Sequence, residues 1–420
     1  MLIMKVLWCT QSMPGFKPDA GYYNGCGWIS ALLDEFHSID NIELGVAFYF
    51  DKLIDPIVYD GVTFFPILQR KVSVTGKIKT FFGDYSCWES EDNKHLLQLH
   101  SVIERFSPDV IHVWGTETDM GLIAREVDIP VVVHLQGLLQ PYKNALCPPF
   151  VSRFNYIFKD GYSLISMLKN FNNLKYWEYK ADRELRIFRV CKHYFGRTHW
   201  DKTISKFFNS ESRYYYCSEM LRPEFYTGIV WDVPNNTDCF RIVSTISPPL
   251  YKGADLILKT AKLLKNNSDF NFEWNVIGVN QINYAEHITG ITAEQVNVKC
   301  IGIKGASEIK DIELNSHLYF HPSYIDNSPN SVCEAQRLGM PVIATNVGGV
   351  TSILDNGKTG WLVSPNDPYM AASLIVNFVY NKTMLVEKRD VTIKIATARH
   401  DKSYIINSLL NGYKAILQHP

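Results

Sequence analysis

Two carboxylates eight positions apart, Asp326 and Glu334, stand on either side of the proline at position 329. Proline fits the first position of a helix and Ser328 before it is a natural N-cap, so Asp326 belongs to a loop and Glu334 to the second helical turn. Carboxylates accept hydrogen bonds from ligand hydroxyls, whereas the amides at a helix N-terminus bind phosphate. Together these groups indicate a sugar-nucleotide site, although a surface aspartate and a glutamate near a helix cap would produce the same spacing.

The elements that would position these carboxylates follow one another in the sequence. An apolar strand at 318–320 precedes the loop, Gly339 ends the helix, and a strand of the buried type at 341–345 leads to a glycine pair at 348–349. This order of strand, loop, helix, strand and glycine turn is one unit of a parallel sheet. Ligands bind beyond the carboxyl ends of the strands in such sheets, which is where both carboxylates would lie.

The stretch 321–350 resembles the donor-binding motif of the family-4 retaining glycosyltransferases, which have the GT-B architecture. Asp326 stands where the first glutamate of their E-x7-E pattern is usual, and Glu334 stands at the second. The resemblance implies that Glu334 takes the ribose hydroxyls of the donor and that Asp326, one methylene shorter than glutamate, faces the transferred sugar. Asn330 and Ser331, at the start of the same helix, are then expected to contact the donor.

A second match lies at the start of the same half of the chain. Lys252 and Gly253 fall on the K-G pair of the family, whose lysine neutralises the donor diphosphate. Ser247 stands where an arginine is usual five positions before that lysine, so one local positive charge is missing. Arg197, at a strand–helix junction that is similar to one in relatives of the family, is expected to replace it from across the cleft, with a structural ion pair as an equal alternative.

Two further contacts are expected from the first half of the chain. His134 ends an inner strand, where a histidine is by default part of the core. In the family a histidine at this position contacts the donor sugar, so the resemblance places His134 with Lys252 and Asp326 among the catalytic candidates. Gly25 and Gly27 precede a helix and are similar to the family's glycine loop between donor phosphate and acceptor, although such turns also serve only to pack a helix on a strand.

Composition narrows the class of protein. The 420 residues are 46% hydrophobic, which suffices for two full cores, and 42 basic against 43 acidic residues give no reason to expect nucleic acid. The nine cysteines form no C-x-x-C pair, so neither a zinc site nor a disulfide framework is indicated. The first ten residues are predicted to form a strand and not a signal peptide. We therefore expect a reduced cytoplasmic protein, located in part at the inner face of the membrane.

The predicted fold is α/β, with two doubly wound Rossmann-like domains facing a cleft, as in GT-B enzymes. The acceptor-side domain is expected at 1–220, a linker at 221–240 and the donor-binding domain at 241–399. The apolar helix at about 400–420 is expected to return to the first domain.

An aromatic segment in the first half of the chain is a candidate surface for contact with a lipid-linked acceptor. It is apolar and partly basic, and an enzyme that acts on a lipid-linked acceptor can use such a surface for peripheral membrane contact. Its apolar members are Pro149, Phe150, Phe154, Tyr156, Ile157 and Phe158.

The function implied by the resemblance is that of a metal-independent retaining glycosyltransferase of the hexosyltransferase type. It would move a sugar from a nucleotide-sugar donor to a hydroxyl of a glycan or lipid-linked acceptor in cell-surface polysaccharide biosynthesis. No Asp-x-Asp motif stands in a donor-loop setting, so no metal and no cofactor besides the nucleotide-sugar substrate is expected. A sugar-nucleotide epimerase of the same architecture and a non-catalytic nucleotide-sugar-binding protein remain the alternatives.

Overall fold

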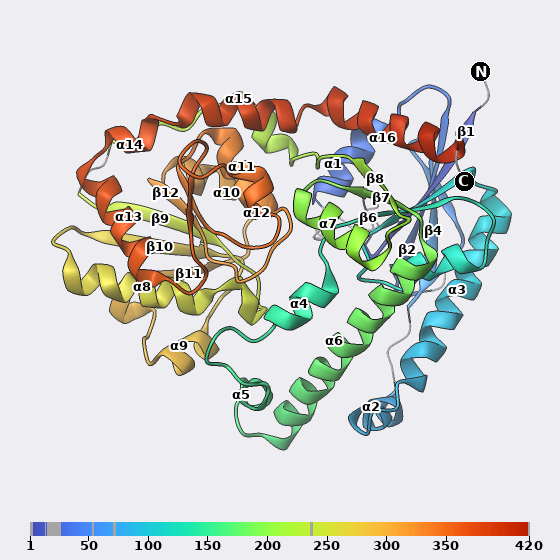
Figure 1. Ribbon diagram of the computed structural model, residues 1–420, viewed down its shortest axis with the longest axis horizontal. Helices are drawn as coiled ribbons and strands as arrows, with labels where there is room; N and C mark the ends of the chain where they lie inside the picture. The colour runs from blue at the N-terminus through green and yellow to red at the C-terminus, as the bar shows by residue number, and fades with distance from the viewer. Residues whose placement is uncertain are drawn as a thin grey trace. The chain divides into compact units, whose positions relative to one another are not determined.

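The computed structural model describes residues 3–12, 14, 27–52, 54–69, 73–235 and 238–418. Its contacts divide the chain into two compact units, each described separately below. The first unit comprises Met1–Lys143, Leu164–Met220 and His400–Pro420, and the second comprises Asn144–Ser163 and Leu221–Arg399. Each unit is a mainly parallel sheet covered by helices (Figure 1), as the sequence predicts.

The eight-stranded sheet of the first unit has the order β3-β4-β2-β1-β5-β6-β7-β8. All neighbouring pairs are parallel except β3 with β4. The chain reverses its direction of winding between β1 and β5, and such a switch point opens a crevice at the carboxyl ends of the strands. The strands are β1 Met4–Thr10, β2 Ile42–Phe50, β3 Ile57–Tyr59, β4 Val62–Leu68, β5 Val110–Trp114, β6 Val131–His134, β7 His193–Gly196 and β8 Arg213–Tyr216.

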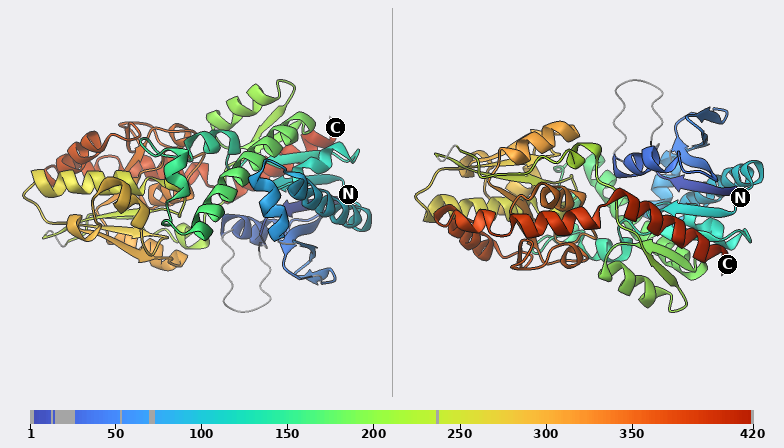
Figure 2. Two further views of the ribbon diagram at one scale, coloured as in Figure 1. Left: turned by 90° about the horizontal axis from the view of Figure 1, so that it is seen from below. Right: turned by 90° about the horizontal axis from the view of Figure 1, so that it is seen from above.

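Alternate residues of β1 pack on opposite faces of this sheet, because successive side chains of a strand point to opposite sides. Leu7 and Cys9 belong to the cluster that contains the buried leucines of α3. Trp8 instead packs on Phe36 of α1 and donates from Nε1 to the hydroxyl of Tyr413 on α16, 3.1 Å away. The C-terminal helix α16 is therefore part of the first unit (Figure 2).

The helices of the first unit range in length from 6 to 27 residues. They are α1 Gly27–Phe36, α2 Val74–Phe81, α3 Ser86–Phe106, η1 Met120–Arg125, α4 Leu139–Ala145 (whose last two residues are counted with the second unit), α6 Leu164–Val190, α7 His199–Phe208 and α16 Lys402–Gln418.

The six-stranded sheet of the second unit is wholly parallel, with the order β11-β10-β9-β12-β13-β14. Residues 318–320 and 342–344 of this sheet are continuous apolar runs and fully buried, as is typical of parallel strands with helices on both faces. The switch point lies between β9 and β12, so the loops that follow these two strands flank the expected ligand crevice. The strands are β9 Phe240–Thr245, β10 Phe272–Ile277, β11 Val298–Gly302, β12 Leu318–His321, β13 Val342–Thr345 and β14 Trp361–Val363.

Two segments pack with the second unit although the sequence placed them elsewhere. Residues 144–163, which include α5, were expected in the first domain. Within the expected linker at 221–240, Trp231 is fully buried and donates from Nε1 to the carbonyl of Ser316, 2.7 Å away. The helices of this unit are α5 Arg153–Ile157, η2 Pro223–Tyr226, η3 Leu250–Lys252, α8 Ala254–Asn267, α9 Asn283–Thr289, η4 Glu294–Val296, α10 Ala306–Leu314, α11 Asn330–Leu338, α12 Val350–Ile353, α13 Pro368–Tyr380, α14 Thr383–Val386 and α15 Arg389–Arg399.

The helix of the carboxylate motif ends as predicted but begins one residue later. Pro329 is the N-cap of α11 and not its first residue, and Ser328 lies one position before that cap. Gly339 ends it with a φ of 84°, in the left-handed region that favours glycine. Over the described part of the chain, no helix has both the length and the apolar character that crossing a bilayer requires.

Candidate functional site

The loops that follow β9 and β12 touch each other at the switch point of the second unit. Gly253, with a φ of 79°, ends η3 at the start of α8, and a Cβ built on it would lie 2.1 Å from the carbonyl oxygen of Pro322. Tyr324 donates its amide to the carbonyl of Tyr251, 2.7 Å away. Any side chain at position 253 would push these loops apart, so Gly253 serves the close approach of two backbones.

This approach brings Lys252 and Asp326 together across 74 positions of sequence. The Lys252 Nζ donates to Asp326 Oδ2 over 2.6 Å, and His321 Nε2 lies 3.3 Å from the same oxygen. Burial alone would raise the pKa of Asp326, but the Lys252 ammonium and the contact with His321 outweigh burial and hold this pKa below its ordinary value. Asp326 is thus a buried anion, while the Lys252 side chain keeps 21% of its surface exposed.

The second carboxylate of the motif is held by an arginine that the sequence analysis did not single out. Arg222 donates from Nε and Nη2 to the two oxygens of Glu334, at 2.7 and 2.6 Å. Bidentate pairs of this kind fix both position and orientation of a carboxylate. Glu334 is nearly fully buried, whereas Arg222 retains 19% exposure of its side chain. The two residues are 112 positions apart, so no local spacing pattern points to the pair.

The N-terminus of α11 faces the same end of the sheet, because it follows β12 directly. Asn330 and Ser331 form its first turn, and both are partly exposed. A helix N-terminus attracts anions through its amides and its dipole. The sequence-predicted residues Lys252, Asp326, Asn330, Ser331 and Glu334 therefore all lie on two adjoining segments of one unit.

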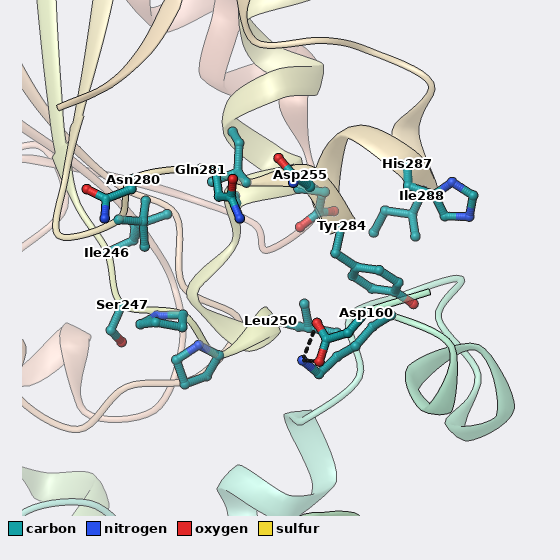
Figure 3. A pocket seen from close by; sticks show the side chains of 18 of the residues that line it. Asp160, Ile246, Ser247, Leu250, Asp255, Asn280, Gln281, Tyr284, His287 and Ile288 are labelled. Atoms are coloured by element: carbon teal, nitrogen blue, oxygen red, sulfur yellow. Dashed lines mark hydrogen bonds and ion pairs between the residues drawn. The ribbon is translucent and has the colours of Figure 1, made fainter. Parts of the chain in front are cut away.

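A cavity of about 1020 Å³ opens beside the loop after β9 (Figure 3). Ser247 is exposed and lines it, together with Gly278, Asn280 and Tyr284 from the segment after β10. Residues 158–162 line it as well, so part of its wall comes from a segment that the sequence assigned to the other domain. Its volume suits a ligand of the size of a nucleotide.

The structure places His134 in the core of the first unit. Its side chain is fully buried, and its ring lies 4.7 Å from that of Trp114 and 5.8 Å from that of Trp28. Burial lowers the pKa of His134 well below its usual value, so the ring is neutral. Trp28 is a neighbour in space that no spacing in the sequence predicts, and in this arrangement the His134 ring has no surface for a ligand.

Arg197 is also buried in the first unit. Its guanidinium forms an ion pair with Glu219, donates to Gln136 Oε1 at 3.2 Å and lies 5.0 Å from the ring centre of Trp28. The structural ion pair that the sequence left open is thus present. Gly27 is the first residue of α1, and Gly25 lies outside the described residues.

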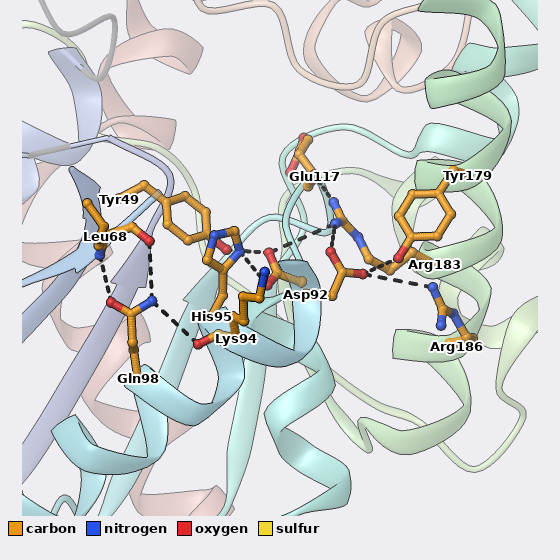
Figure 4. A network of polar contacts seen from close by, with 11 residues as sticks. Tyr49, Leu68, Asp92, Lys94, His95, Gln98, Glu117, Tyr179, Arg183 and Arg186 are labelled. Carbon is orange, nitrogen blue, oxygen red and sulfur yellow. Dashed lines mark hydrogen bonds and ion pairs between the residues drawn. The ribbon is translucent and has the colours of Figure 1, made fainter. Parts of the chain in front are cut away.

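A buried ionic network in the first unit was not expected (Figure 4). Arg183 Nη1 donates to Asp92 at 2.8 Å, and its Nη2 donates to the carbonyl of Glu117 at 2.6 Å. His95 Nδ1 lies 3.1 Å from Asp119. The network joins α3, α6 and the segment after β5, and its members are too far apart in sequence to form a motif.

Comparisons with known proteins relate most of the second unit to a known family. Residues 232–399 match the family described as glycosyl transferases group 1. The amylovoran biosynthesis glycosyltransferase AmsK of Erwinia amylovora is 24% identical over 144 residues, which are 32% of this chain and 35% of that protein. The capsular polysaccharide biosynthesis glycosyltransferase CapM of Staphylococcus aureus is 26% identical over 137 residues, again 32% and 35% of the two chains. The chain spans only about a third of the length of such curated relatives.

Solved structures extend the likeness to the whole chain. A sucrose-phosphate synthase from Thermosynechococcus elongatus superimposes with a TM-score of 0.73 at 12% identity, covering 99% of this chain and 100% of the other. HepE from Anabaena, in complex with UDP and glucose, gives 0.63 at 14% identity, covering 98% and 100%. At these identities the likeness establishes the fold alone, and it confirms the predicted GT-B architecture. Together with the family match it confirms the predicted resemblance to glycosyltransferases.

Proposed function

We propose, on the premise that residues 232–399 belong to glycosyl transferases group 1, that this chain is a retaining glycosyltransferase. Its donor is a nucleoside-diphosphate sugar, and its acceptor is a hydroxyl of a glycan or lipid-linked glycan in the synthesis of a cell-surface polysaccharide. The observation that carries the proposal is the cluster of Lys252 and Asp326 beside the N-terminus of α11, with Glu334 held in the same helix. Cation, amides and carboxylates at one sheet edge match the diphosphate and the hydroxyls of such a donor.

The reaction places its greatest demand on the leaving nucleoside diphosphate, because negative charge grows there as the bond to the anomeric carbon breaks. Lys252 and the amides of the first turn of α11 stabilise this charge. The acceptor oxygen forms the new bond on the same face of the sugar, and its proton passes to the leaving phosphate. Asp326, a buried anion paired with Lys252, orients the lysine and contacts the sugar hydroxyls. Glu334 binds the ribose.

Two observations limit what donor the site takes. Ser247 leaves its position in the cavity wall without the cation usual in the family, although Lys159 lines the same wall. We assign the main charge for the diphosphate to Lys252, beside the N-terminus of α11. HepE is similar in fold and its structure holds UDP and glucose, which makes a uridine nucleotide the first donor to try.

Incubation of the protein with membrane lipid extracts and a panel of sugar nucleotides tests the activity by mass spectrometry. A lipid or glycan whose mass rises by one hexose supports transfer. Conversion of one sugar nucleotide into its epimer without acceptor, which leaves the mass unchanged and is followed by proton NMR, would show the isomerase. Tight nucleotide binding with no turnover on any acceptor would support the alternative of a non-catalytic nucleotide-sugar-binding protein.

Transfer is expected to persist in excess EDTA, since Lys252 and helix amides provide the positive potential for the diphosphate. Turnover is measured with and without chelator after dialysis. Full loss in EDTA, reversed by a divalent cation, would contradict this metal-independent site.

A further inference from the structure

The first unit exposes a cluster of large apolar side chains at the junction of α2 with the first half of α6. On α2 and directly after it, Ile78, Phe81 and Phe82 are 55%, 39% and 80% exposed. On the first turns of α6, Leu164, Ile165 and Leu168 are 68%, 79% and 41% exposed. We name these six residues the α2–α6 patch.

The two groups of residues in the patch lie on helices that pack against each other. The rings of Phe81 and Phe171 lie 4.6 Å apart and join α2 to α6, and those of Phe81 and Phe82 lie 5.3 Å apart. Leu164, Leu168 and Phe171 follow one another at helical spacings of four and three, so they lie along one side of α6. Figure 1 shows α2 beside the N-terminal half of α6. Scattered apolar side chains on a surface need no explanation, but a contiguous patch marks an interaction site.

The charges around the patch select its partner. Every charged residue of α2 is a lysine, and so is every charged residue from Leu164 to Trp177. Lys79 keeps 61% of its side chain exposed, with Asp84 only at a loose 3.9 Å, and Lys169 is also exposed. Phenylalanine, leucine and isoleucine beside exposed lysines, with Asp84 as the acidic residue next to α2, resemble the composition of a surface that enters the headgroup region of an anionic bilayer.

We propose that the α2–α6 patch docks this chain on a membrane surface rich in anionic lipid. The apolar side chains enter the boundary between headgroups and acyl chains, and Lys79 and Lys169 meet the lipid phosphates. The chain thereby lies on the membrane and does not span it. This inference concerns the first unit and stands whether or not the second unit transfers a sugar.

Co-sedimentation of the full chain with phosphatidylcholine vesicles, with and without about one-third phosphatidylglycerol, tests the proposal. Binding is expected to the anionic vesicles, with loss of binding at about 0.5 M salt. Phe82→Glu and Ile165→Glu should each lower the partition coefficient at least tenfold, because a carboxylate replaces an inserted side chain. Lys79→Gln and Lys169→Gln should each lower it about fivefold.

Phe207→Glu is the matched control, since Phe207 is 78% exposed on α7 of the same unit but lies in neither α2 nor α6. It should bind vesicles as the unaltered protein does. The proposal is overturned if the unaltered protein does not bind anionic vesicles. It is also overturned if Phe82→Glu and Phe207→Glu bind these vesicles with equal affinity. Concentration-dependent self-association that Phe82→Glu abolishes, without vesicle binding, would assign the patch to a second copy of the chain instead.

Discussion

The two units build the same kind of sheet and end their central strands in opposite ways. At the switch point of the second unit, a charged pair of Lys252 and Asp326 stands at the strand ends with the lysine partly exposed. At the carboxyl-terminal edge of the first unit's sheet, the last residues of β5 and β6 are Trp114 and His134. Their rings stack 4.7 Å apart, and both side chains are fully or nearly fully buried. The edge in the second unit holds an ion pair whose lysine is partly exposed, and the edge in the first unit is occupied by buried aromatic rings.

The difference shows that sheet topology determines where a crevice forms, whereas the side chains at the strand ends determine what that crevice can bind. A switch point places loop ends near one another whatever they carry. In the second unit those loops carry opposite charges, whose cost of burial is offset by pairing and hydrogen bonding. In the first unit the last residues of β5 and β6 are the neutral rings of Trp114 and His134. The segment after β5 directs Asp119 and the carbonyl of Glu117 to the network around Arg183.

Replacing Lys252 should have the largest effect, since it removes the charge that sets the second unit apart. Lys252→Ala is expected to lower kcat about a hundredfold or more, because a contact with developing charge stabilises the transition state more than the ground state. Affinity for the product nucleoside diphosphate should fall less. Both quantities are measured on one preparation, with Lys262→Ala, an exposed lysine of α8, as control. Small and equal losses would make Lys252 a binding residue only.

Removing Glu334 should have the second-largest effect. Glu334→Ala is expected to weaken nucleotide binding by about 1.5–3 kcal/mol, the range for a lost hydrogen bond to a charged group. Titration calorimetry with a nucleoside diphosphate gives the value. If the affinity stays unchanged, the ribose does not lie on this carboxylate.

Arg222 should matter less than the carboxylate that it holds. Arg222→Met is expected to weaken nucleotide binding by about 1 kcal/mol, since Glu334 remains present but loses its bidentate partner. The double variant with Glu334→Ala should bind like Glu334→Ala alone, because the two residues act through one contact. Tighter binding by Arg222→Met would show instead that the arginine competes with the ribose for Glu334.

Substitution in the first unit should have the smallest effect on turnover and give the sharpest contrast with the second unit. Burial lowers the pKa of His134 well below its usual value, so below about pH 6.5 the unfolded chain binds a proton that the folded unit does not. The free energy of unfolding therefore falls as the pH falls, by up to about 2 kcal/mol for this group between pH 6.5 and 5.

His134→Phe should remove this part of the pH dependence and leave turnover close to that of the unaltered protein. Hydrogen exchange of the β5 and β6 amides at pH 7 and pH 5, corrected for intrinsic rates, measures the first effect. A large loss of turnover with unchanged stability would show that His134 contacts the donor. The two sheet edges would then not differ in the way described.

Much of the second unit was determined by local sequence. Gly339 can take the left-handed conformation that ends α11, and an apolar run before and after that helix predicts parallel strands. The spacing of Asp326 and Glu334 around a proline places one in a loop and one in a helix. The helix start was missed by one residue, because Pro329 takes the N-cap position itself.

Only the tertiary structure decided which groups meet. The pairing of Arg222 with Glu334 joins residues 112 positions apart, and the contact of Lys252 with Asp326 depends on two loops approaching at Gly253. The burial of His134 depends on Trp28 covering it, and neither residue carries that information by itself. Patterns of apolarity and turn residues act over one helix or strand, whereas charge pairing and burial depend on elements that only the packed fold brings together.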